Sequence, residues 1–216
     1  PDAKHIVYQV GYYSVEQNKS HQVLYIVDID GKNKKLLTLS KNNETDPQWI
    51  ENGKKIAYLC DGQIWAMNTD GSSKTKISRS DVDIEGFSFS PDEKKVILIK
   101  SINYYGSIQQ KPSDLPKASG RVVNDLNYRH WDHYVESIPH PFIAGVSCDT
   151  IEVAGGDGPQ FEISINNDAV DILDGEPFEC PLAPFGGIEQ LSWSPDSKKI
   201  AYSCKKNEGT KYTIST

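Results

Sequence analysis

The densest group of residues able to do chemistry is Arg129-His130-Trp131-Asp132, which His133 follows directly. Histidines beside a carboxylate can serve as metal ligands. The spacing fits no helical ligand pattern and no Cys-x-x-Cys pair exists, so we expect neither a metal nor a cofactor. We interpret these four residues as candidates for lining a substrate cavity or a domain interface. In the alternative interpretation, Trp131 packs at a sheet edge while Arg129 and Asp132 pair locally.

A nucleophile for acyl transfer is not evident in the sequence. Such a serine usually sits on a sharp strand–helix turn within Gly-x-Ser-x-Gly. No such pentapeptide occurs, and no alternating strand–helix pattern is present to hold one. We therefore assign no catalytic residue. Asp157, within Gly155–Gly158, is interpreted as a hairpin tip because the alternating ligands of a calcium loop are missing.

Composition excludes several classes of function. The 216 residues carry a net charge of −7 and no pronounced basic run, so nucleic acid is not an expected partner. No apolar run approaches the roughly 20 residues that span a bilayer, so no membrane is expected either. The four cysteines allow three pairings, and we expect buried free thiols: Cys60, Cys148, Cys180 and Cys204.

The elements around these residues follow a repeat. One strand–turn–strand phrase occurs three times, at Trp49–Tyr58, Phe89–Leu98 and Trp193–Tyr202, and Pro1–Tyr8 matches its second half. Trp49 and Phe89 are 40 residues apart. A period of about 40–45 residues with four strands is typical of a β-propeller blade. The repeated aromatic residue is therefore predicted to pack between sheets, and the repeated Ser-Pro-Asp to form a turn.

The predicted fold is all-β. We expect a partial β-propeller of about three to four four-stranded antiparallel blades, truncated at both ends. Residues 1–216 would form one propeller fragment with blades at approximately 1–40 (lacking its inner strand), 44–78, 81–180 (with long insertions) and 188–216 (incomplete). Because an open arc leaves apolar blade faces uncovered, we expect dimerisation through the first and last blades.

Insertions distinguish the blades from one another. About ten extra residues, Gly11–His21, interrupt the first blade. The third blade has outer strands predicted at His140–Gly145 and Ala169–Leu173, a short helix near Ser113–Ala118 and an extra hairpin within Val146–Asn167. Long insertions on a regular scaffold are common places for binding.

Several phrases carry a family resemblance. Trp193–Tyr202 resembles the WD40-like repeat of TolB-type propellers and of the propellers in prolyl oligopeptidase family (S9) serine peptidases. Gly120–Tyr134, followed by His140-Pro141-Phe142, resembles a segment of bacterial dipeptidyl and acylaminoacyl peptidases of that family. Asp174–Phe178 and Phe185–Glu189 are similar to the family's link into the next blade. The resemblance covers nearly the whole chain.

The resemblance implies part of a large periplasmic or secreted exopeptidase. In that family a seven- or eight-bladed propeller filters substrates for a C-terminal α/β-hydrolase domain, which supplies the catalytic Ser, Asp and His. The expected function is thus substrate gating without catalysis. The expected partners are the hydrolase domain of the same parent chain and the parent's peptide substrate. Some dipeptidyl peptidases hold the substrate amine with adjacent glutamates, but here Glu16, Glu136 and Glu189 are isolated in the sequence.

Two alternatives remain open. A stand-alone TolB-like propeller would bind protein partners, and a Gly-x-Ser-x-Gly downstream of Thr216 would argue against it. A lyase or glycosidase propeller would need carboxylates or histidines clustered on the inner strands. The predicted inner strands carry mostly aromatic, Ser and Gln residues.

Overall fold

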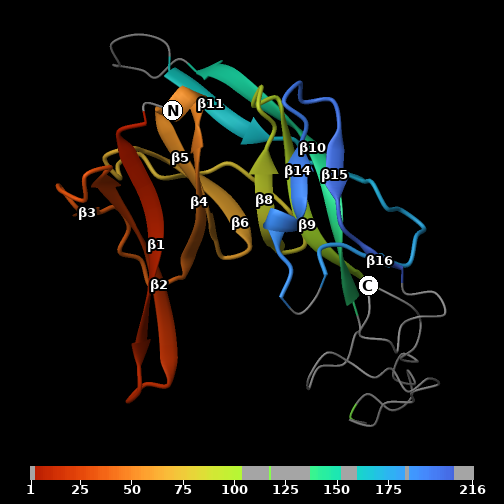
Figure 1. The fold of residues 1–216 in the computed structure, drawn as a ribbon, viewed down its shortest axis with the longest axis horizontal. Coiled ribbons are helices and arrows are strands. Elements are labelled where there is room, and N and C mark those ends of the chain that lie inside the picture. The colour runs from red at the N-terminus through yellow and green to blue at the C-terminus, as the bar shows by residue number, and fades with distance from the viewer. Residues whose placement is uncertain (1–2, 104–116, 118–136, 152–159, 183–184, 207–216) are drawn as a thin grey trace.

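The computed structural model describes residues 3–103, 117, 137–151, 160–182 and 185–206. Within these residues the regular elements are β-strands and two short 3-10 turns. Figure 1 shows the first three sheets side by side across the molecule, in chain order. The fold class predicted from the sequence, an all-β arrangement of propeller type, is confirmed, while the number and bounds of the blades stay predictions.

The first sheet is a three-stranded antiparallel sheet with order β1-β2-β3. Its strands are β1 (His5–Ser14), β2 (Lys19–Asp28) and β3 (Lys35–Leu36). The pairing of β1 with β2 continues from His5↔Asp28 out to Ser14↔Lys19. The additional residues therefore lengthen this hairpin, which protrudes from the body of the molecule (Figure 1).

The second sheet shows the complete four-stranded unit, with order β4-β5-β6-β7. Its elements are β4 (Glu44–Ile50), η1 (Glu51–Gly53), β5 (Lys55–Cys60), β6 (Gln63–Asn68) and β7 (Thr75–Lys76). Asn52 and Gly53 have φ of 53° and 84°, the left-handed conformation that an Asn-Gly turn favours. Every residue of β5 from Ile56 to Cys60 is buried, because sheets cover both of its faces.

The third sheet is larger, with order β11-β10-β9-β8 and β12 pairing with β10. Its strands are β8 (Ile84–Phe89), β9 (Lys95–Asn103), β10 (Ser137–Ile151), β11 (Gln160–Ile165) and β12 (Val170–Asp171). The predicted outer strand and the first arm of the predicted hairpin form one continuous strand, β10. Residues 152–159 at the hairpin tip, Asp157 included, lie outside the described residues, as does the predicted helix near 113–118 except for Lys117.

Two small sheets complete the described chain. Strand β14 (Leu191–Trp193) follows η2 (Ile188–Gln190) and pairs with β15 (Ile200–Tyr202), and β13 (Phe178–Glu179) pairs with β16 (Lys205–Lys206). Both pairs are antiparallel.

Apolar clusters between successive sheets hold the structure together. Alternate residues of β5 face opposite neighbours: Ile56 and Tyr58 pack with residues of the first sheet, and Ala57 and Leu59 pack with those of the third. The three repeated aromatic residues each pack against a different cluster, namely Trp49, Phe89 and Trp193. The predicted packing role of this repeated position is confirmed.

The Ser-Pro-Asp turns also connect neighbouring sheets. The Ser90 hydroxyl donates to Asp92 at 2.7 Å and the Ser194 hydroxyl to Asp196 at 2.6 Å, and these bonds hold the pKa of each aspartate below its usual value. The residue after each aspartate contacts the turn before it. Glu93 accepts the Glu51 N–H at 2.7 Å, and the Ser197 hydroxyl accepts the Asp92 N–H at 3.1 Å. These aspartates are therefore structural, as predicted.

Candidate functional site

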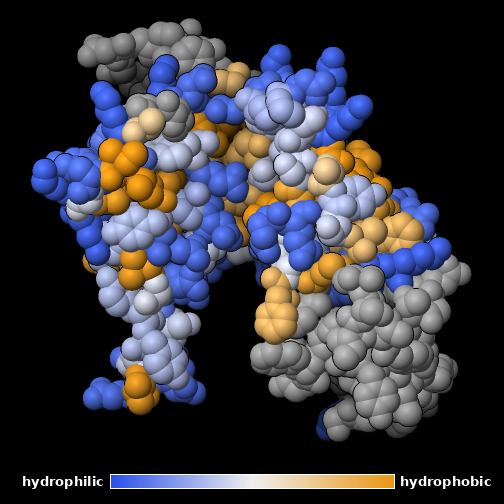
Figure 2. Space-filling view, in the orientation of Figure 1, coloured by the Kyte–Doolittle hydropathy of each residue, from blue (hydrophilic) through white to orange (hydrophobic). Residues whose placement is uncertain are grey.

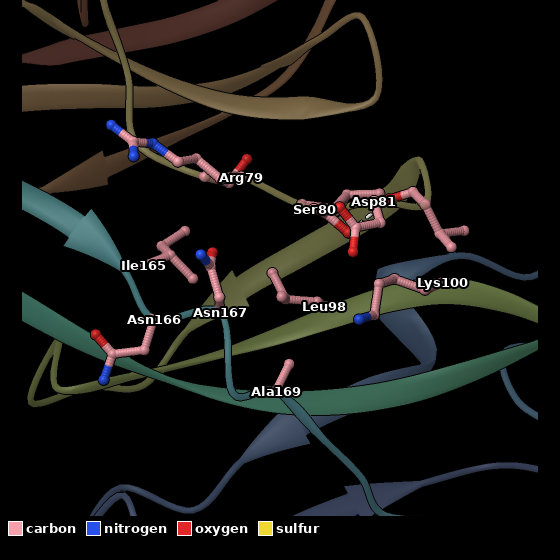
Figure 3. A pocket seen from close by; sticks show the side chains of 12 residues that line it. Arg79, Ser80, Asp81, Leu98, Lys100, Ile165, Asn166, Asn167 and Ala169 are labelled. Atoms are coloured by element: carbon pink, nitrogen blue, oxygen red, sulfur yellow. Dashed lines mark hydrogen bonds between the residues drawn. The ribbon is translucent and has the colours of Figure 1, made fainter.

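A cavity of about 280 Å³ lies between the second and third sheets. It is formed by the β7–β8 loop, by β9 and by the segment between β11 and β12 (Figure 3). We call it the inter-sheet cavity. Its charged lining comes from Arg79, Asp81 and Lys100, and Leu98, Ile165 and Ala169 provide apolar lining. Figure 3 shows Asp81 and Lys100 on the same side of the cavity.

Lys100 is a charged group of the lining that packs against an aromatic ring. Its ammonium nitrogen lies 4.0 Å from the centre of the Phe142 ring, a cation–π contact. Burial lowers the pKa of Lys100, and the negative charges of Asp171 and Asp81 oppose that shift. The lysine thus presents a partly desolvated cation to the cavity, suited to an anionic or carbonyl group of a ligand.

A buried histidine–aspartate pair lies beside Lys100. In the β9–β10 register His140 is directly opposite Lys100. The His140 side chain is fully buried, and its Nδ1 donates to Asp171 Oδ2 at 2.9 Å. Asp171 Oδ1 accepts the Leu173 N–H at 2.8 Å, which fixes the carboxylate. Among the described residues, His140 Nε2 has no hydrogen-bond partner.

The arrangement has the character of a binding surface. Ser78 and Ser80 line the cavity, but the Ser78 hydroxyl donates to Gln63 Oε1 at 2.8 Å and the Ser80 hydroxyl to the Val82 carbonyl at 2.6 Å. A serine nucleophile would need its hydroxyl directed at a general base such as His140. Neither serine hydroxyl is directed at His140, and the described lining of the cavity offers charged and apolar groups to a ligand.

A second polar feature is a pair of carboxylates, Asp46 and Glu189, from two different parts of the fold. Burial raises the pKa of Asp46, on β4, and the nearby charge of Glu189, in η2, raises it further. Glu189 appeared isolated in the sequence, yet the fold brings it near this carboxylate. The repeat gave no signal for this proximity, because Asp46 precedes Trp49 by three residues whereas Glu189 precedes Trp193 by four. Within the described ranges, no three metal-binding side chains gather.

The site residues predicted from sequence are not tested by the structure. Arg129, His130, Trp131 and Asp132 all lie in the segment 118–136, outside the described residues. Sequence reasoning missed Lys100, His140 and Asp171. One signal could have found Lys100. It occupies the repeat position held by Cys60 and Cys204, which is eleven residues after the repeated aromatic residue in each copy. A charged residue replaces a small apolar one there.

The thiols differ from expectation in one respect. Cys60 and Cys180 are buried as predicted and Cys204 is partly buried, but Cys148 is exposed, so its predicted burial is wrong. Cys148 lies on the arm of β10 that runs beyond β9 into the β11 hairpin, where the register with β9 has ended at Gly145.

Successive antiparallel sheets that repeat one turn, one packing position and one inter-sheet contact define a chain of the β-propeller type. No family model matches it. The chain is 40% identical over 220 residues to dipeptidyl-peptidase 5 of Porphyromonas gingivalis, covering 100% of this chain and 30% of that protein. It is 34% identical to dipeptidyl-peptidase 5 of Porphyromonas endodontalis with the same coverage. The predicted resemblance to dipeptidyl peptidases is confirmed.

Among solved structures, the acylaminoacyl peptidase of Pyrococcus horikoshii is similar over 82% of this chain and 32% of its own, with a TM-score of 0.47 and 12% identity. The chain spans about 30% of the length of the two dipeptidyl-peptidase 5 relatives that it matches. Within the described residues, no helix is long and apolar enough to cross a bilayer.

Proposed function

We propose that this chain is the non-catalytic β-propeller part of a serine exopeptidase of the dipeptidyl or acylaminoacyl type, where it restricts substrate access to a separate hydrolase domain. The observation that carries this proposal is the 40% identity to a dipeptidyl-peptidase 5 along the entire chain. Because the match accounts for 30% of that relative, most of the relative lies outside it. In the inter-sheet cavity the Ser78 and Ser80 hydroxyls donate hydrogen bonds to Gln63 and to the Val82 carbonyl, which supports a role without covalent chemistry.

The proposed partners are the α/β-hydrolase domain of the same parent chain and the parent's peptide substrate. Arg129, His130, Trp131 and Asp132 are proposed to line the substrate cavity or to face the hydrolase domain. The parent would act in the periplasm or outside the cell. Fractionation of the native host should recover it there, and recovery with cytosolic markers would contradict this location.

The 216-residue chain alone should not hydrolyse dipeptidyl p-nitroanilides, because the proposal places the nucleophile elsewhere in the parent. The measurement is release of p-nitroaniline by the purified chain, together with labelling by a fluorophosphonate that reacts with activated serines. Hydrolysis whose rate falls in proportion to fluorophosphonate labelling would contradict the assignment.

Gating needs a separate measurement on the full-length parent. Cleavage should fall steeply as the peptide substrate is lengthened and should be undetectable for a folded protein. A parent that cleaves short and long unstructured substrates at equal rates would remove the gating role, while the propeller assignment would stand.

Self-association is the remaining proposed interaction. Seven large hydrophobic side chains in the first sheet and its loops are exposed: Ile6, Tyr12, Tyr13, Val15, Ile29, Leu36 and Leu39. Figure 2 shows apolar patches on this side of the molecule among hydrophilic residues. The purified chain should therefore sediment as a dimer at micromolar concentration. A monomer that binds no apolar dye would contradict this expectation.

A further inference from the structure

Two cysteines adjoin the short pairing of β13 with β16, Cys180 directly after β13 and Cys204 directly before β16. Phe178 is opposite Lys206, and Glu179 is opposite Lys205. The pairing ends there, and extending the same antiparallel register by one residue would place Cys180 opposite Cys204. Directly opposed residues in an antiparallel pair have Cα atoms about 4.5–5.5 Å apart, which is within the Cα separation that a disulfide spans.

Independent contacts place both side chains on one face. Cys180 is fully buried in the apolar cluster that contains Ile97, Ile99 and Leu191, and Cys204 packs against the same cluster. Residues two apart on a strand share a face. The next pair on this face, Phe178 and Lys206, is also in contact, with the ammonium nitrogen 5.9 Å from the ring centre. The two thiols therefore lie on the same side of the β13–β16 pair.

We propose that Cys180 and Cys204 form a disulfide when the chain folds in the presence of a disulfide oxidant, such as a thiol–disulfide oxidoreductase or oxidised glutathione. Each thiol gives up one hydrogen, and together they lose two electrons as the sulfur–sulfur bond forms. The oxidant's disulfide takes up these electrons and protons and becomes two thiols. The bond would close a loop of about 25 residues that contains β14 and β15, and would tie both strands to β13.

The order of events follows from the surroundings of Cys180. Burial raises the pKa of the Cys180 thiol to about 12, and the proximity of Cys204 adds to the shift. Only a thiolate attacks a disulfide. In the folded, reduced protein Cys180 thus reacts slowly, so the bond should form during folding, before the cluster closes over the thiol. The other two cysteines lack such a partner in register, since Cys60 is opposite Glu44 and Gln63, and Cys148 is opposite Ile163.

The test is oxidative refolding of the 216-residue chain in a glutathione redox buffer, followed by alkylation with iodoacetamide in denaturant. Digestion with trypsin and Glu-C then places each cysteine in a separate peptide, because Glu179 and Glu189 bound the peptide of Cys180 and Lys199 and Lys205 bound that of Cys204. Without reductant, peptides 180–189 and 200–205 should appear joined, with Cys60 and Cys148 alkylated. Alkylation of all four cysteines, or a different pairing, would overturn the proposal.

A second measurement keeps the proposal testable in variants. Reduction of the linked protein should lower the melting temperature by about 5–10 °C, given the loop length and chain size. The Cys148→Ser variant should keep this reductant-dependent shift, because its thiol is exposed and outside the pair. The Cys204→Ser variant should lose it. An equal shift in both variants would overturn the proposal.

Discussion

Replacing Phe87 by alanine should lower the free energy of unfolding by about 3–5 kcal/mol. Phe87 is fully buried on β8, within the cluster that joins the second and third sheets. Its ring meets Phe89 edge-on, with ring centres 5.9 Å apart and planes at 89°. Truncation would remove this contact and leave a cavity at the junction of two sheets. Urea unfolding followed by tryptophan fluorescence measures the change.

The matched control is Val170→Ala, because Val170 is also a large apolar residue but is 64% exposed and lies outside the proposed self-association surface. It should change the free energy of unfolding by less than about 0.5 kcal/mol. If Phe87→Ala unfolded at the same urea concentration as Val170→Ala, the second and third sheets would not depend on a shared core. The propeller-type packing described above would then be wrong.

The repeat made much of this fold predictable from the sequence. A residue pattern that recurs after 40 positions predicts both the strand–turn–strand unit and the shared role of each position. Trp49, Phe89 and Trp193 pack against three successive clusters as this rule requires. The turn at Asn52-Gly53 follows from local chemistry, since both residues tolerate positive φ at little cost.

Contacts between different repeats were not predictable in the same way. Asp46 and Glu189 are 143 positions apart, and only the fold brings their charges together. The proposed pairing of Cys180 with Cys204 follows from the register of two-residue strands, which carry too few side chains to show a periodic pattern. The sequence predicts a strand at His140–Gly145 and a separate hairpin from Val146 onward, whereas the structure has one strand, β10. Its first part pairs with β9 and its second part with β11.

The inter-sheet cavity illustrates the same limit. Lys100 could be recognised as the charged exception at a repeat position, but its neighbours come from inserted segments without a repeated counterpart. The pairing of His140 with Asp171 arises because β12 returns to β10 after the β11 hairpin. That return crosses an insertion whose length no repeat predicts.

Replacing Asp171 by alanine should lower the free energy of unfolding by about 2–4 kcal/mol, because two buried donors would lose their acceptor. Asp171 accepts from His140 Nδ1 at 2.9 Å and from the Leu173 N–H at 2.8 Å. His140 is fully buried, so water cannot replace the lost bond without opening the sheet. The Asp171→Asn variant keeps a carbonyl oxygen and should lose only about 1 kcal/mol. Thermal and urea unfolding of both variants provide the measurement.

Two comparisons separate the histidine–aspartate bond from a general effect of removing charge. Asp168→Ala removes an exposed carboxylate three residues away and should cost less than about 0.5 kcal/mol. In a His140→Phe background, which removes the donor and keeps the ring volume, Asp171→Ala should cost at least about 1 kcal/mol less than in the native chain. Equal costs in the two backgrounds would show that the pair is not coupled. The stability of β12 would then come from its backbone pairing with β10 and not from the buried side chains behind the cavity.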